Sequence, residues 1–259
     1  MRFLSMHSEI ELKFLSTKSG DKIAYKMSQG RGSTLIWCGG LKSDMEGGKA
    51  THLNDWAIQE NRNYIRFDYF GHGQSTGLFR DGTISQWAQD VVQIMDDLTK
   101  GDVILVGSSM GGWASLLAML KRPKRVKALL LIAPAPDFTE KLMWKNWTDE
   151  QRQTLINDGI LYEPSDYDEP YEYSQALIED GRANQILDNP INFEGPVRIL
   201  QGAQDTVVPW EYSKQIIDMI TSPDVDYTLV KNGDHSLSSA ADLKRLVLSA
   251  QVLCQKIED

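Results

Sequence analysis

The stretch that decides the fold reads Val103-Ile104-Leu105-Val106-Gly107-Ser108-Ser109-Met110-Gly111-Gly112-Trp113. Its four leading aliphatic residues are typical of a strand that is buried on both faces. A helix-length stretch then runs from Gly111 to Lys121. Between a strand and a helix, the pattern G-x-S-x-G predicts a sharp turn that leaves its central serine exposed at the sheet edge. A simpler interpretation is a turn of small residues that only caps the helix.

Strand and helix alternate on both sides of this turn. Further short apolar runs indicate strands at Thr34–Trp37, Tyr64–Phe67, Ala128–Ile132, Val197–Leu200 and Tyr227–Val230. Helix-length stretches lie at Lys49–Gln59, Ile84–Thr99, Glu211–Ile220 and Ala241–Ile257. Near the start of the chain, Glu9–Leu15 and Lys22–Met27 alternate around Ser19-Gly20-Asp21, which is typical of a hairpin. We therefore predict an α/β fold with a mostly parallel eight-stranded sheet and helices on both faces.

The alternation is interrupted once, between Ala135 and Ile191. No strand candidate occurs there, whereas Asp149–Asn157 and Tyr173–Gly181 have helical character. A structureless loop of this length is improbable inside a compact domain. We predict a single domain over residues 1–259 with a small helical insertion at about 136–190, called the cap segment below.

The formal charge of −9 is concentrated in the cap segment. From Asp137 to Pro190 there are 13 acidic and four basic residues, so the rest of the chain is balanced. Nucleic-acid binding requires clustered basic residues, and we expect no such partner. A solvated acidic face is the default explanation of the excess.

The sequence also predicts a cytoplasmic protein without a membrane-spanning segment. No stretch approaches the roughly 18 uninterrupted apolar residues that a spanning helix requires. Charged residues occur at Glu9, Glu11 and Lys13, where a signal peptide would have an apolar block.

Neither a metal nor an organic cofactor is indicated. Cys38 and Cys254 are far apart and lack the spacing of a zinc site or a disulfide framework, so we expect two small buried hydrophobic residues. The stretches Gly47-Gly48-Lys49 and Gly71-His72-Gly73 lack the further residues that a P-loop and a dinucleotide fingerprint need.

The serine of the turn points to nucleophilic chemistry if a base is available. The hydroxyl of Ser109 is a poor nucleophile near neutral pH, and the chain has four histidines that could activate it. His7 lies in the amino-terminal arm, His52 inside the first helix and His72 in a turn after the fourth strand. His235 lies just before the final helix, where the chain order serine, acid, histidine requires it. We predict Ser109 as nucleophile and His235 as base.

Two carboxylates compete for the role of orienting the histidine. Asp205 follows the strand candidate Val197–Leu200, between serine and histidine in the chain. Asp234 is adjacent to His235, but neighbouring side chains in an extended loop usually diverge, which favours a turn-forming role. Asp205 is the favoured acid and Asp234 its rival.

An oxyanion formed on attack needs donors near the serine. The N–H group after the nucleophile, that of Met110, is one candidate, and the loop Cys38-Gly39-Gly40-Leu41 supplies a second through Leu41. The glycines allow the backbone to approach a substrate. Lys42 is bulkier than the small residue expected at its position.

These motifs together resemble a known superfamily. The residues that carry the resemblance are Arg66-Phe67-Asp68-Tyr69-Phe70-Gly71-His72-Gly73-Gln74-Ser75, Gly107 to Trp113, Gly202 to Pro209 and Gly233 to His235. They resemble the α/β-hydrolases over most of the chain. Finer details resemble the branch that contains the mitochondrial acyl-protein thioesterase and acyl-glucuronide esterase of animals and bacterial relatives, namely Ser43-Asp44-Met45, Lys49-Ala50, Val208-Pro209-Trp210 and Ser222-Pro223-Asp224-Val225-Asp226. The resemblance implies an α/β-hydrolase fold, the triad Ser109, Asp205 and His235, and an ester or thioester substrate.

Our leading hypothesis is a serine hydrolase that cleaves carboxylic esters or thioesters of a small molecule or an acylated protein through an acyl-enzyme intermediate. Four cap residues could wall an acyl pocket, or could simply pack the cap onto the body: Leu142, Met143, Trp144 and Trp147. A ligand-binding module with slow or no turnover is an alternative from another class. A peptidase or a carbon–carbon bond hydrolase is the alternative among enzymes, because the same triad serves them.

Overall fold

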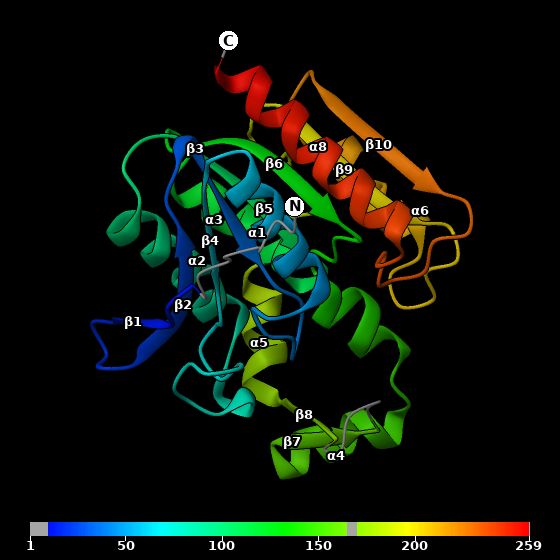
Figure 1. The fold of residues 1–259 in the computed structure, drawn as a ribbon. Helices are drawn as coiled ribbons and strands as arrows, with labels where there is room; N and C mark the ends of the chain where they lie inside the picture. Colours follow the sequence, from blue (N-terminus) through cyan, green and yellow to red (C-terminus); the bar gives the residue numbers. More distant parts are fainter. Residues whose placement is uncertain (1–9, 165–169, 259) are drawn as a thin grey trace.

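Eight strands form the central sheet of the computed structural model, which describes residues 10–164 and 170–258 (Figure 1). Their order across the sheet is β1-β2-β4-β3-β5-β6-β9-β10, antiparallel at β1–β2 and β2–β4 and parallel elsewhere. The strands are β1 (Lys13–Ser16), β2 (Lys22–Ser28), β3 (Arg31–Cys38), β4 (Arg62–Phe67), β5 (Val103–Ser108), β6 (Val126–Ile132), β9 (Val197–Gly202) and β10 (Val225–Val230). The predicted sheet is confirmed; Glu9, where the first predicted strand began, lies outside the described residues.

Helices cover both faces of this sheet. The helices are α1 (Gly48–Gln59), α2 (Ile84–Leu98), α3 (Met110–Lys121), α6 (Trp210–Ser213), α7 (Gln215–Met219) and α8 (Ala240–Glu258), with a 3-10 turn η1 at Phe79–Asp81. Helices α1 and α8 pack on one face, and α2 and α3 pack on the other. In the described part of the chain, no helix is long and apolar enough to cross a membrane.

The central strands are apolar on both sides because each face has its own core. In β5, Ile104 and Val106 contribute to the core under α1 and α8. Val103 and Leu105 contribute to the core under α2 and α3, which also contains Trp113. Successive side chains of a strand point to opposite faces, so a strand covered on both faces reads as a continuous apolar run.

The cap segment differs from the predicted helical insertion. It contains a π-helical turn η2 (Thr139–Trp144), α4 (Asp149–Asp158), α5 (Gln175–Ala183) and an antiparallel pair, β7 (Ile160–Glu163) and β8 (Tyr171–Ser174). The expectation of no strand in this segment was wrong, because each strand has only four residues and too short a pattern to recognise. Figure 1 shows β7, β8 and α4 at the end of the molecule opposite the carboxyl terminus.

Two helix boundaries also differ from the prediction. The stretch that begins at Tyr173 is a strand first, and α5 starts only at Gln175, where the Ser174 side chain accepts a hydrogen bond from the Leu177 N–H. The helix expected over Glu211–Ile220 is divided into α6 and α7 at Lys214. There the Ile217 N–H bonds to a carbonyl three residues back instead of four.

Candidate active site

The turn between β5 and α3 places Ser109 in an unusual backbone conformation. Its φ is 54° and its ψ is −119°, a region that residues with a side chain rarely adopt. Glycines permit the close packing around it. A Cβ at Gly107 would lie 2.5 Å from the Gly111 carbonyl oxygen, and one at Gly111 would lie 2.1 Å from the Cys38 carbonyl oxygen. The strained serine between two such glycines is the arrangement expected of an exposed nucleophile.

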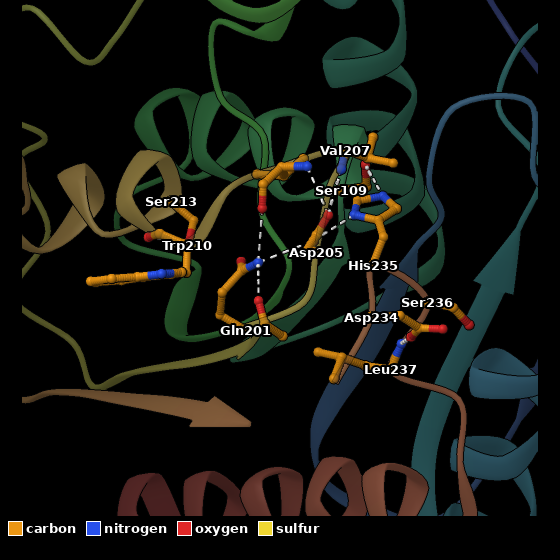
Figure 2. Close-up of polar contacts among 12 residues, drawn as sticks. Ser109, Gln201, Asp205, Val207, Trp210, Ser213, Asp234, His235, Ser236 and Leu237 are labelled. Carbon is orange, nitrogen blue, oxygen red and sulfur yellow. Dashed lines mark hydrogen bonds and ion pairs between the residues drawn. The ribbon is translucent and has the colours of Figure 1, made fainter. Parts of the chain in front are cut away.

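The three predicted triad residues meet in space (Figure 2). The Nε2 atom of His235 lies 3.1 Å from Ser109 Oγ, and its Nδ1 atom lies 2.8 Å from Asp205 Oδ2. A carboxylate can only accept, so Nδ1 carries the hydrogen and Nε2 is left to accept the serine hydroxyl proton. Residues 126 and 30 positions apart in the sequence therefore form one continuous hydrogen-bonded chain.

The carboxylate of Asp205 is buried and yet stays ionised. Burial by itself would raise its pKa, but hydrogen bonds from His235 and from the N–H groups of Val207 and Val208 hold the pKa below its usual value. Those two N–H groups lie 2.9 and 2.8 Å from Oδ1. An ionised carboxylate beside Nδ1 favours the protonated imidazole that proton transfer from serine would create.

The rival carboxylate points elsewhere. Asp234 Oδ1 accepts a hydrogen bond from the Leu237 N–H at 2.9 Å, and Figure 2 shows it directed away from the imidazole of His235. Asp234 thus shapes the turn that carries His235, as expected of an aspartate in a loop.

The predicted oxyanion donors flank the nucleophile. A Cβ placed on Gly40 would lie 3.5 Å from the Cβ of Ser109, so the loop that contains Leu41 lies directly against the serine. The N–H of Ser109 itself bonds to the Ile132 carbonyl, which leaves that of Met110 as the first N–H of helix α3. Within the described part of the chain, no hydrogen bond to another protein group uses the N–H of Leu41 or Met110.

The predicted acyl-pocket residues are partly engaged in packing. Trp147 is buried, with ring centroids 6.2 Å from Trp144 and 5.9 Å from Tyr173. The guanidinium of Arg182 lies 4.3 Å from the centre of the Trp144 ring. Leu142 and Met143 pack against the same core cluster as Trp147. A role of these four residues in substrate binding stays a prediction.

Two residues that hold the candidate triad or its loops in place were not predicted from the sequence. Gln201 is fully buried in β9, and its Nε2 lies 3.0 Å from Asp205 Oδ2 and 3.0 Å from the Val208 carbonyl oxygen. Lys49 extends from α1 and donates to the carbonyl of Ser236, the residue after His235. The signal for Gln201 was a polar residue near the end of a fully buried strand, although β9 also contains the polar residue Arg198.

Comparison with known proteins identifies the family. Residues 50–160 match the family model described as alpha/beta hydrolase fold. The human palmitoyl-protein thioesterase ABHD10, named as mitochondrial, is 36% identical over 248 residues, which cover 95% of this chain and 81% of the human protein.

Solved structures agree with this assignment. A putative hydrolase from Agrobacterium vitis S4 is 37% identical and superposes with a TM-score of 0.91, covering 95% of this chain and 99% of that one. The α/β-hydrolase domain-containing protein 10 from mouse is 35% identical with a TM-score of 0.88 and the same coverage of both chains. These relatives confirm the predicted fold and the predicted hydrolase class. The chain belongs to the α/β-hydrolase family, in the group that includes the ABHD10 thioesterases.

Proposed function

We propose that the chain is a serine hydrolase that cleaves carboxylic esters or thioesters through an acyl-enzyme, with Ser109, His235 and Asp205 as its catalytic triad. The observation that carries the proposal is the pair of hydrogen bonds of 3.1 and 2.8 Å that links the three side chains. Hydrogen bonds in this order allow a histidine to take the proton from a serine hydroxyl. The strained turn at Ser109 exposes that hydroxyl.

The proposed reaction has two steps, acylation of Ser109 and hydrolysis of the acyl-enzyme. Ser109 Oγ attacks the acyl carbonyl carbon while its proton passes to His235 Nε2, and the N–H groups of Leu41 and Met110 stabilise the oxyanion. The intermediate collapses, the bond to the leaving alcohol or thiol breaks, and His235 returns the proton to that group. A water then attacks the acyl-enzyme while His235 Nε2 takes its proton. The bond from the acyl carbon to Ser109 Oγ breaks, His235 returns the proton to Oγ, and the carboxylic acid leaves. Asp205 stays ionised throughout and stabilises the imidazolium.

The substrate in this proposal carries an apolar acyl group on a small molecule or a protein. Support comes from the names of the ABHD10 relatives as palmitoyl-protein thioesterases. The aromatic residues of the cap segment, a unit whose limits at 136–190 remain a prediction, would contact the acyl chain. The cytoplasmic location also stays a prediction, since those relatives are named as mitochondrial.

Covalent labelling tests the nucleophile. A fluorophosphonate probe should label the wild-type protein and the Ser108→Ala variant, and labelling should be lost in Ser109→Ala. Ser108 is the matched control because it is the serine next to Ser109, at the end of β5. Labelling that persists in Ser109→Ala would overturn the assignment.

Turnover separates an enzyme from a binding module. Matched ester, thioester and amide substrates of varied acyl length should give steady release of the acid, with esters and thioesters preferred. A single burst of leaving group without further turnover would instead favour a slow ligand-binding module, and preference for amides would favour a peptidase.

A further inference from the structure

His72 lies in the loop after β4 and has no part in the proposed catalytic triad. Its side chain is buried and makes edge-to-face contacts with Tyr69, Phe79 and Trp87, at centroid distances of 5.7, 5.4 and 5.2 Å. Burial lowers the pKa of His72 to about 4, because desolvation disfavours the charged imidazolium. The ring is therefore neutral at physiological pH.

Both nitrogens of the neutral ring have a partner. Nδ1 lies 3.1 Å from the carbonyl oxygen of Phe70, which can only accept, so Nδ1 carries the hydrogen. Nε2 then accepts a hydrogen bond from the main-chain N–H of Lys42 at 3.0 Å. The imidazole thus bridges the loop after β4 to the loop after β3 that contains the proposed oxyanion donor.

Leu41 lies between two peptide groups that are both held in place. The Gly40 carbonyl accepts from the N–H and the hydroxyl of Ser43, at 3.2 and 2.8 Å. Because C=O and N–H point in opposite directions across a planar trans peptide, these bonds orient the Leu41 N–H as long as the backbone between Gly40 and Ser43 keeps its shape. The next peptide group, between Leu41 and Lys42, is held through its N–H, which donates to His72 Nε2.

The backbone at Lys42 needs this support. Its φ of 55° lies in the left-handed region that favours glycine, and a residue with a side chain stays there only when its surroundings hold it. A second bond joins the same two loops, since the Met45 N–H donates to Asp68 Oδ1 at 2.7 Å. The loop after β4 therefore holds the loop after β3 at two main-chain N–H groups.

We propose that His72 is a positioning residue for the oxyanion hole, which it serves by accepting the Lys42 N–H and so fixing the peptide that follows Leu41. This inference rests on the proposed function, because it presumes that the Leu41 N–H stabilises an oxyanion. The His72 ring is buried, so the role that we propose requires no contact with the substrate. It acts through the geometry of the loop, and removing its acceptor atom leaves the Leu41 donor in place but poorly aimed.

The test replaces the acceptor and keeps the packing. His72→Phe fills the same aromatic cluster without a nitrogen, and His72→Gln can restore an acceptor near the position of Nε2. On a short p-nitrophenyl ester, His72→Phe should lower kcat by about 10- to 100-fold with KM changed less than about threefold. The inhibition constant of a trifluoromethyl ketone, whose adduct with serine carries an oxyanion, should rise by a similar factor. His72→Gln should recover part of both losses.

The matched control is Tyr69→Phe. It alters a ring that contacts His72 at 5.7 Å but leaves both ring nitrogens with their partners, so kcat and inhibitor affinity should stay within about twofold of wild type. Wild-type kcat and inhibitor affinity in His72→Phe would overturn the inference and leave the proposed function intact. A wild-type protein that hydrolyses no ester or thioester would refute both.

A measurement on the wild-type protein keeps the inference testable if the variants do not fold. Nitrogen NMR at neutral pH should show the His72 ring neutral with its hydrogen on Nδ1, and the Lys42 amide should exchange slowly with solvent. A protonated ring or a rapidly exchanging Lys42 amide would contradict the proposed bond.

Discussion

Asp205 shows how a single buried side chain can carry a stable charge. Its side chain is fully buried, a state in which an isolated carboxylate would take up a proton. Hydrogen bonds from His235, from Gln201 and from two main-chain N–H groups replace the lost water. Asp234, by contrast, has its carboxylate committed to a turn. The hydrogen-bond donors around Asp205 therefore favour it over Asp234 as the acid that orients His235.

Exchange of each carboxylate for an amide tests this choice. Asp205→Asn should lower kcat on an ester substrate by about three to four orders of magnitude, because the amide no longer selects the tautomer of His235 that accepts the serine proton. Asp234→Asn keeps an oxygen that can accept from the Leu237 N–H, so its kcat should stay within about threefold of wild type. A near-normal rate in Asp205→Asn would transfer the role to Asp234.

Helix α3 depends on glycine for its distance from the sheet. A Cβ on Gly111 would lie 2.1 Å from the carbonyl oxygen of Cys38 and 2.3 Å from that of Gly39. Both atoms belong to the backbone at the end of β3 and the loop after it, so neither can move aside cheaply. Close approach of α3 to β3 is also what brings Ser109 next to the proposed oxyanion donor at Leu41.

We expect Gly111→Ala to lower the free energy of unfolding by about 2 to 3 kcal/mol, measured by urea denaturation, because the added methyl group forces helix and strand apart. The control is Gly48→Ala at the first turn of α1, where a Cβ meets no atom within 4 Å. Alanine is the better helix former, so this variant should be as stable as wild type or slightly more stable. Equal stability of the two variants would rule out the steric argument.

Contacts between the cap segment and the body join distant parts of the chain. The ammonium of Lys42 lies 2.9 Å from the Pro170 carbonyl oxygen, and the Ser85 N–H donates to Asp180 at 2.8 Å. Lys42 also lies over the ring of Tyr171, at 5.4 Å from its centre. The bulky residue at position 42 is thus explained, because its side chain reaches the β7–β8 hairpin while its main chain belongs to the loop of the proposed oxyanion donor Leu41.

Lys42→Met should loosen the β7–β8 hairpin without unfolding the body. Loss of the charged hydrogen bond and the ring contact, worth about 1 kcal/mol together at this partly exposed position, should make hairpin amides exchange roughly fivefold faster. Hydrogen–deuterium exchange read by mass spectrometry measures this, with the amides of β5 as an internal reference. Lys42→Arg retains the charge and should exchange like wild type. Unchanged exchange in Lys42→Met would show that other contacts hold the cap.

The sheet and the candidate triad could be predicted from local pattern. Strands such as β5 read as short apolar runs, and the spacing of Gly107, Ser109 and Gly111 marks the turn that exposes the serine. His235 could be selected by elimination because the chain offers only four histidines. The strands and the turn are readable because each depends on residue types close together in the chain, and His235 is readable because the chain offers few candidates.

The β7–β8 hairpin, the division between α6 and α7, and the supporting roles of Gln201, Lys49 and His72 emerged only in three dimensions. Four-residue strands carry too little periodicity to be recognised, and they form because the folded chain places them side by side. A buried glutamine or histidine is selected by partners that are distant in sequence, as His72 is by an N–H group 30 residues away. Residue order thus determined which groups could react, and folding determined which donors and acceptors surround them, because hydrogen bonding and desolvation depend on distance in space.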